Sequence, residues 1–225
     1  MTNKINNISI DSIILSFLDG QLRVLLVKHA EGPSEGKWGL PGGYVDEDES
    51  LDAAAYRLLD THTGLSDVYL EQLKAFGDVH RFPDERVITI SYFALVKASQ
   101  AMIHAGSTVF DVEWFPFNDV PEMIYDHNEI LNFGIQRLQH IVRHEPIGFK
   151  LLPEEFTLLE LQSLYETVLE TSFDKPNFRR KLLKMKLLID TKKKQKNVSH
   201  RAANLFKFDT EVYNRLKEKG FSFDL

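Results

Sequence analysis

The stretch from residue 42 to residue 65, GGYVDEDESLDAAAYRLLDTHTGL, places several carboxylates next to a predicted helix, where they could bind a cation. An acidic run, Asp46–Glu49, precedes a segment that is expected to be helical over residues 50–63. Its carboxylates could bind a hard divalent cation weakly, because Mg²⁺ and Mn²⁺ prefer oxygen ligands. The simpler interpretation is an acidic helix N-terminus, where the helix macrodipole favours negative charge.

Basic residues form a second chemically distinct group near the other end of the chain. Residues 175–201 contain 11 lysines and arginines and a single acid, Asp190. Arginine and asparagine can form paired hydrogen bonds with guanine and adenine, and lysine suits phosphate contacts. A solvated basic surface is the alternative. The candidate DNA-contacting residues are Lys175, Asn177, Arg179, Arg180, Lys181, Lys184, Lys192, Lys193, Lys194, Lys196 and Arg201.

Charge is divided unevenly along the 225 residues. Residues 1–145 have a net charge of −11, and residues 146–225 have a net charge of +5. This division suggests an acidic domain joined to a basic one. The chain has no cysteine, which excludes disulfides and thiolate metal sites and fits a reducing compartment. It also has no signal-peptide pattern and no apolar run of membrane-spanning length, so we expect a cytoplasmic protein without a membrane partner.

The acidic stretch over residues 42–65 must be held in place by the rest of its domain, which is predicted to consist of strands and two helices. Residues 8–29 form two runs of alternating and apolar residues on either side of an Asp-Gly pair, which is typical of a β-hairpin. Residues 74–98 indicate two strands joined by a proline-containing loop. A serine can cap the helix at 50–63, a glycine can end it, and residues 127–142 form an amphipathic helix. These patterns predict a compact α/β sandwich over residues 1–145.

The basic group requires a different arrangement of elements. Residues 143–153, RHEPIGFKLLP, contain two prolines and a glycine and mark the expected domain boundary. Leucines at helical spacing follow over 157–171, and Asp174 can cap a second, basic helix over 175–186. Two strands around a basic tip come next. Together these elements predict a small α+β winged-helix domain over residues 146–225.

The stretch over residues 43–65 resembles the Nudix box. The pattern of that family is G-x5-E-x7-R-E-U-x-E-E-x-G-U, with U an aliphatic residue. The KWGLPGG motif directly before it is also typical of that family. The resemblance covers about residues 8–145 and implies an α/β/α sandwich in which a glutamate and an arginine pair across the box. The matching positions are Gly43, Glu49, Arg57, Leu59, Gly64 and Leu65.

Three positions of the box where the family has glutamates carry Leu58, Thr61 and His62 instead. In the family these glutamates lie on one helix face and hold divalent cations against a substrate diphosphate. Leucine has no ligand atom, threonine offers a weak neutral oxygen, and histidine is a poor Mg²⁺ ligand. We therefore predict that the protein is not an enzyme and has no catalytic residues, no metal site and no cofactor.

A sandwich that keeps its shape still offers a pocket for a small molecule. Trp38 or Tyr92 could pack a ring against the C–H face of a sugar. The charged loop of Arg81, Asp84 and Arg86 is expected to be solvated, and the alternative is that it overhangs the pocket. For each candidate, ordinary packing is the alternative. The candidate ligand-binding residues are Lys28, Trp38, Gly42, Gly43, Glu49, His80 and Tyr92.

The basic half, over about residues 149–209, resembles the C-terminal domain of Nudix-related transcriptional regulators. LLPEEFTLLELQSLYE and DKPNFRRKLL carry this resemblance. It implies a winged helix that binds operator DNA. Because winged helices that read palindromes usually act as dimers, we expect a homodimer on a palindromic operator.

Within this family the sequence looks most like the arabinose-responsive branch, which has lost the catalytic glutamates. We therefore expect a repressor of sugar-utilisation genes that L-arabinose releases from operator DNA. A diphosphate ligand would favour retention of metal-binding carboxylates. The alternatives are a regulator of NAD metabolism that senses ADP-ribose, and a Nudix hydrolase with an unorthodox metal site.

Overall fold

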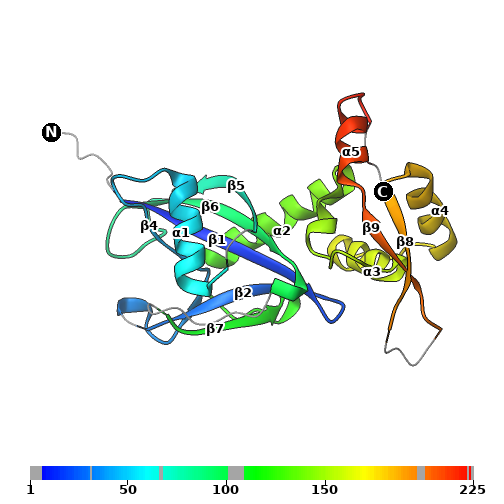
Figure 1. The fold of residues 1–225 in the computed structure, drawn as a ribbon. Helices are drawn as coiled ribbons and strands as arrows, with labels where there is room; N and C mark the ends of the chain where they lie inside the picture. Colours follow the sequence, from blue (N-terminus) through cyan, green and yellow to red (C-terminus); the bar gives the residue numbers. More distant parts are fainter. Residues whose placement is uncertain are drawn as a thin grey trace. The chain divides into compact units, whose positions relative to one another are not determined.

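The computed structural model describes residues 7–30, 32–65, 68–100, 109–196, 201–221 and 223. The described chain forms two compact units (Figure 1). One contains the described residues up to Ser16 together with Arg23–Gln136, and the other contains Phe17–Leu22 with those from Arg137 onward. The units divide inside a helix, so the expected domain boundary between residues 145 and 146 stays a prediction.

The first unit is built on a mixed sheet that has seven strands within the described residues. Its central order is β3-β2-β1-β6-β5, while β4 pairs with β1 and β7 pairs with β2. β1 runs parallel to β6, whereas β4, β3, β7 and β5 pair antiparallel with their neighbours. The strands are β1 (Asn7–Leu18), β2 (Gln21–His29), β3 (Trp38–Gly39), β4 (Gly42–Tyr44), β5 (Tyr69–Phe76), β6 (Val87–Val96) and β7 (Val109–Pro116).

The turn between β1 and β2 and the ends of the first helix follow local sequence signals. Asp19 and Gly20 both adopt the left-handed conformation, with φ of 51° and 77°, as the hairpin pattern predicts. The helix α1 (Leu51–Thr63) begins where Ser50 Oγ accepts the backbone N–H of Ala53 at 3.2 Å. It ends at Gly64, whose φ is 69°.

Two helices, α1 and α2 (His127–His144), cover opposite faces of the sheet (Figure 1). The alternation of side chains along β1 explains this arrangement. Ile10 packs in a buried cluster with Leu58 and two alanines of α1. Ile13, on the other face of the strand, lies against Gly134 of α2. The α/β/α sandwich is therefore confirmed. Short 3-10 turns are η1 (Gly32–Ser34), η2 (Ala98–Gln100), η3 (Phe117–Asp119) and η4 (Pro146–Lys150).

The second unit is a winged helix, as predicted. Its elements are α3 (Leu158–Leu169), α4 (Lys175–Met185), β8 (Leu188–Lys194), β9 (Asn204–Phe208) and α5 (Thr210–Lys217). Thr157 and Glu160 form a capping box at the start of α3. Asp174 Oδ1 accepts the backbone N–H of Asn177 at 3.1 Å and caps α4. The sequence patterns do not predict α5. No helix in the described part of the chain combines the length and apolarity that a membrane span requires.

Gly134→Ala is expected to lower the free energy of unfolding by about 1–3 kcal/mol, because the added methyl group would collide with the fully buried Ile13. The gain in helix propensity, about 1 kcal/mol, is too small to offset a collision of this kind. Gly77→Ala is the matched control, since a methyl group there meets its nearest side-chain atom at 3.6 Å. Urea unfolding compares the two variants, and equal stabilities would contradict the close packing of α2 on β1.

Candidate functional site

The loop between β4 and α1 keeps its shape through an ion pair between Glu49 and Arg57. Arg57 Nε donates to Glu49 Oε2 at 2.9 Å, and Nη2 contacts Oε1. Arg57 Nη2 also donates to the carbonyl of Tyr44 at 3.1 Å, and Glu49 Oε1 accepts the backbone N–H of Asp46 at 2.8 Å. The hydrogen bonds from Arg57 lower the pKa of Glu49 to about 2, so this carboxylate is ionised at neutral pH. Glu49 thus fixes the loop, which is the role that the Nudix resemblance implies.

The helix face that carries carboxylates in the Nudix pattern is used for packing here. Leu58 is buried, and its Cδ2 lies 2.7 Å from where a Cβ on Gly43 would be. Thr61 is exposed, whereas His62 is buried. Burial, followed by the nearby His29 and Arg57, lowers the pKa of His62 to about 4. These residues do not fit a Mg²⁺ or Mn²⁺ site, and no group of three or more potential metal ligands occurs among the described residues.

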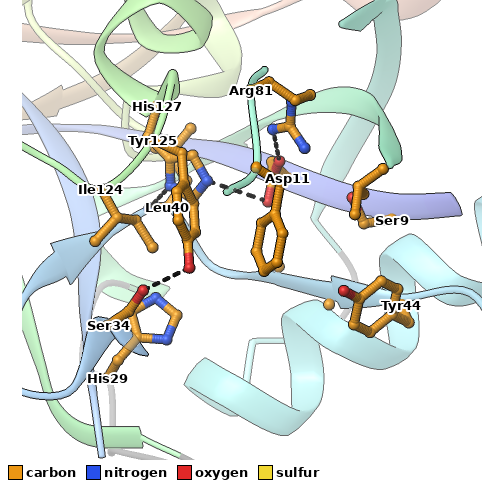
Figure 2. A pocket seen from close by; sticks show the side chains of 14 residues that line it. Ser9, Asp11, His29, Ser34, Leu40, Tyr44, Arg81, Ile124, Tyr125 and His127 are labelled. Atoms are coloured by element: carbon orange, nitrogen blue, oxygen red, sulfur yellow. Dashed lines mark hydrogen bonds and ion pairs between the residues drawn. The ribbon is translucent and has the colours of Figure 1, made fainter. Parts of the chain in front are cut away.

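A cavity of about 220 Å³ opens beside the first strand (Figure 2). β1 and β4 supply one wall, and the end of β2, η1, the loop between β5 and β6, and the segment that leads into α2 supply most of the rest. Gly42 allows β4 to approach β1 closely, because a Cβ there would collide with the carbonyl oxygen of Ile10 and with Asp11. The cavity is lined by Ser9, Asp11, His29, Ser34, Leu40, Gly42, Gly43, Tyr44, Arg81, Phe82, Val87, Ile124, Tyr125 and His127.

The base of this cavity is a buried ion-pair cluster centred on Arg81, which we call the Arg81 cluster. Arg81 Nε and Nη2 donate to the two carboxylate oxygens of Asp126, each at 2.8 Å. Nη2 also donates to Asp11 Oδ2 at 3.1 Å (Figure 2). The side chain of Arg81 is 3% exposed, so the expectation that this residue is solvated is wrong. Its loss of hydration is offset by two carboxylates that approach it from separate elements.

Two histidines beside the Arg81 cluster are held in the neutral form. His127 Nδ1 accepts the backbone N–H of Leu40 at 2.9 Å, so the ring proton lies on Nε2, 3.6 Å from Asp11 Oδ1. Burial lowers the pKa of His127, and burial together with His127 lowers the pKa of His29. With both imidazoles neutral, the carboxylates of Asp11 and Asp126 face a single guanidinium. The cavity itself presents the carboxylate of Asp11 as a hydrogen-bond acceptor, which suits a ligand that donates hydroxyl groups.

The structure brings only part of the sequence-predicted ligand residues together. Gly42 and Gly43 line the cavity. Trp38 lines a neighbouring cavity instead, and Lys28 Nζ lies 5.6 Å from the centre of its ring. The backbone glycines are therefore the candidates that share one site with the Arg81 cluster.

Three further candidates, Glu49, His80 and Tyr92, do not line this cavity. Glu49 is engaged by Arg57, and His80 is exposed in the loop between β5 and β6. Tyr92 is buried beneath α1, where its hydroxyl donates to Asp52 Oδ1 at 2.6 Å. The proposed contact of Tyr92 with a sugar ring is corrected accordingly, because the side chain points into the packing of α1 against the sheet.

Several residues of the site were not predicted from the sequence, notably Asp11, Tyr125 and His127. Asp11 offered a signal, since it is the one acid in the apolar strand β1 and a buried acid requires a partner. Its partner Arg81 lies seventy residues further along the chain, and nothing in local spacing connects the two.

The second unit places the predicted DNA-contacting residues on the surface. Phe178 and Leu182 anchor α4 in the core, and every candidate on α4 and on the wing, the β8–β9 hairpin, is exposed. Arg180 Nη2 donates to Asn177 Oδ1 at 2.6 Å, so these two side chains are already arranged together. Lys193 Nζ is paired with Glu155 at 2.7 Å. Residues 197–200, which separate the two strands in the sequence, lie outside the described residues, so the predicted basic tip stays a prediction there.

The turn between α3 and α4 is held by two side chains of α3. Glu166 Oε1 accepts hydrogen bonds from Gln162 Nε2 at 2.9 Å and from the backbone N–H of Phe173 at 2.8 Å. Gln162 Nε2 also donates to the carbonyl of Phe173 at 3.0 Å. These hydrogen bonds lower the pKa of Glu166. They fix the chain directly before Asp174, the residue that caps α4.

Arg81→Met is expected to lower the free energy of unfolding by about 3–5 kcal/mol, because it leaves two largely buried carboxylates without their counter-charge. Arg86→Met is the matched control from the same loop, since that guanidinium donates to exposed backbone carbonyls of Gly77 and Asp78. Its expected loss is about 1 kcal/mol. Urea unfolding without ligand measures both variants. A loss for Arg81→Met no larger than that for Arg86→Met would rule out the Arg81 cluster as a stabilising element.

Comparisons with known proteins match both units. The NUDIX domain family matches residues 10–132, and the NrtR DNA-binding winged helix domain matches residues 148–208. An ADPR responsive transcriptional repressor, NtrR, from Acinetobacter baylyi is 33% identical over 212 residues, which cover 92% of this chain and 83% of that protein.

Solved structures give the same result. The structure of Shewanella oneidensis NrtR complexed with a 27mer DNA has a TM-score of 0.80 and 32% identity, and covers 97% of this chain and 99% of that chain. The NUDIX domain of the same protein complexed with ADP ribose has a TM-score of 0.53 and 33% identity, over 60% of this chain and 90% of that chain. The chain therefore belongs to the Nudix-related transcriptional regulators of the NrtR type, in which a Nudix domain precedes a DNA-binding winged helix.

Proposed function

We propose that this protein is a transcriptional repressor whose Nudix domain binds ADP-ribose and thereby releases operator DNA. The observation that carries the proposal is the match, over 92% of the chain, to a repressor described as responsive to ADP-ribose. A Nudix domain with 33% identity that was crystallised with ADP-ribose supports the same ligand. The proposal favours control of NAD metabolism, which was the alternative interpretation of the sequence.

The expectation that L-arabinose is the effector, and that sugar-utilisation genes are regulated, is not supported. The relative that matches 92% of the chain is described as responsive to ADP-ribose, and the NUDIX domain that was crystallised with ADP-ribose matches 60% of the chain. The expectation rested on the lost carboxylates and on the net charge of −11 over residues 1–145. Metal ions are needed for hydrolysis, whereas binding of a diphosphate can rely on nearby donors and cations. Surface charges further away than about 8 Å are screened by physiological salt, so the net charge of a domain is a poor guide to its ligand.

The Nudix domain is proposed to bind without hydrolysing. Leu58 has no ligand atom and is packed against Gly43, and the buried imidazole of His62 is a poor ligand for Mg²⁺, so neither position suits a cation that bridges a diphosphate. Glu49 is engaged by Arg57. A hydrolase with an unorthodox metal site remains the competing function, and assay of the products separates the two.

Operator binding is proposed to use α4 as the recognition helix and the wing as a phosphate contact. Asn177 and Arg180 are exposed near the N-terminal end of α4, where a recognition helix contacts base edges. Lys192, Lys193 and Lys194 are exposed on β8. A homodimer on a palindromic operator is part of this proposal, because a single recognition helix reads too few base pairs for a specific site.

Arg179→Ala and Arg180→Ala are expected to weaken operator binding by about 1–3 kcal/mol each, because base contacts supply specificity. Replacing Lys192–Lys194 by glutamine should instead weaken binding to all DNA and flatten the salt dependence by about one unit per lost phosphate contact. Lys97→Ala, in the first unit, is the control. Fluorescence anisotropy with operator and scrambled duplexes at several salt concentrations measures these effects. Variants that bind both duplexes like the parent would show that α4 and the wing are misassigned.

ADP-ribose is expected to release the protein from labelled operator DNA and to remain intact during incubation with Mg²⁺ or Mn²⁺. L-arabinose, D-xylose and D-ribose should leave the complex unchanged. Anisotropy records release, and chromatography of the nucleotides records hydrolysis. Release by L-arabinose alone would overturn the ligand assignment. Formation of AMP that EDTA abolishes would overturn the assignment as a sensor without catalysis.

A further inference from the structure

The cavity above the Arg81 cluster is too small to hold the whole of the proposed ligand. Its volume is about 220 Å³. Pockets that enclose drug-sized ligands measure roughly 300–1,000 Å³. ADP-ribose consists of a ribose and an adenosine that are joined through a diphosphate, so it is too large for a cavity of this volume. Any ligand of this length must continue into a neighbouring space.

A second cavity of about 670 Å³ lies directly beside the first within the same unit. The two cavities share Ser34, Ile124 and Tyr125, which form the wall between them. The other residues that line the second cavity are Gly36, Lys37, Trp38, Pro83, Glu122 and Met123. The shared wall makes this space the natural continuation of the first.

The two cavities differ in chemistry in a way that suits the two ends of one ligand. The first has the carboxylate of Asp11 over a buried base, which can accept hydrogen bonds from sugar hydroxyls. The second has the ammonium of Lys37 and the rings of Trp38 and Pro83. A cation suits a phosphate, and an indole suits a planar heterocycle. Lys28 adds a further ammonium near the Trp38 ring.

The wall between the cavities is closed by one hydrogen bond between two hydroxyl groups. Ser34 Oγ and the Tyr125 hydroxyl lie 2.7 Å apart (Figure 2). Tyr125 has a φ of 51°, a left-handed conformation that is unfavourable for a bulky side chain. Its ring is supported by Phe82, with ring centres 4.7 Å apart. A single hydroxyl pair therefore helps to hold a residue whose backbone favours other conformations, which makes this wall easy to open.

We propose that the two cavities are lobes of one binding site and that an elongated ligand opens the Ser34–Tyr125 hydrogen bond when it spans them. The terminal ribose lies over Asp11, and the AMP portion, with its own phosphate and heterocycle, lies beside Lys37 and Trp38. This inference rests on the proposed binding of ADP-ribose. It adds a second lobe and a closing residue pair that the ligand must separate.

Tyr125→Phe and Ser34→Ala are each expected to tighten ADP-ribose binding about three- to tenfold, because neither variant has the hydrogen bond that the ligand must break. The double variant should match the single variants, since both remove the same pair. AMP and ribose 5-phosphate, which each fill one lobe, should bind these variants and the parent equally. Tyr56→Phe, at an exposed tyrosine of α1, is the matched control. Isothermal titration calorimetry on the full chain measures each dissociation constant.

Lys37→Gln tests the second lobe separately. It is expected to weaken AMP and ADP-ribose at least threefold and to leave ribose 5-phosphate unchanged. If the parent binds ADP-ribose but Tyr125→Phe and Ser34→Ala bind it no more tightly, the two cavities are not joined by this pair and the inference is wrong. If the parent does not bind ADP-ribose at all, the proposed function fails as well, and this result is distinct from the first.

Discussion

A buried guanidinium requires counter-charges, and this requirement organises the first unit. Arg81 reaches Asp11 on β1 and Asp126 directly before α2, so a single side chain fixes a strand, a long loop and the start of a helix. His127 follows Asp126 and accepts the backbone N–H of Leu40, which places the segment between β3 and β4 as well. The cavity exists because these segments are held around it. The same bonds set its electrostatics, since the Asp11 carboxylate lines the cavity with one guanidinium as its charged partner and with neutral imidazoles beside it.

The first helix shows that the shape of a Nudix box and its reactivity depend on different residues. The Glu49–Arg57 pair holds the loop through side-chain and backbone hydrogen bonds. The positions that would bind metal can change without disturbing that pair, because they lie further along α1. Leu58 illustrates the result: it is buried and packs against Gly43, so apolar contact replaces a charge that would need a cation. A protein that must bind a diphosphate without cleaving it gains from this separation.

The sequence predicted what depends on neighbouring residues. The Asp-Gly hairpin, the Ser50 cap, the Gly64 helix end and the Asp174 cap all occur where local patterns place them. The Arg81 cluster could not be predicted, because its members come from three separate segments. The orientation of Tyr92 depends on the register of β1 with β6, where it lies opposite Ser12 and faces α1, and no local signal encodes that register. The expectation of L-arabinose, which the comparisons do not support, relied partly on the net charge of 145 residues, whereas the few groups that line a cavity decide what it binds.

The turn before α4 bears on how the protein meets DNA. Glu166 and Gln162 bond to both backbone groups of Phe173, so the entry to α4 is set by the protein alone. If α4 is the recognition helix, as proposed, it would dock nearly as a rigid body and give up little conformational entropy. The wing differs, because Lys193 is paired with Glu155 and would have to exchange it for a phosphate under the proposed assignment, and long lysine side chains lose rotamer freedom when they are held. Under the proposed assignment, base recognition by α4 would therefore be preorganised, whereas the phosphate contacts of the wing would form only when DNA binds.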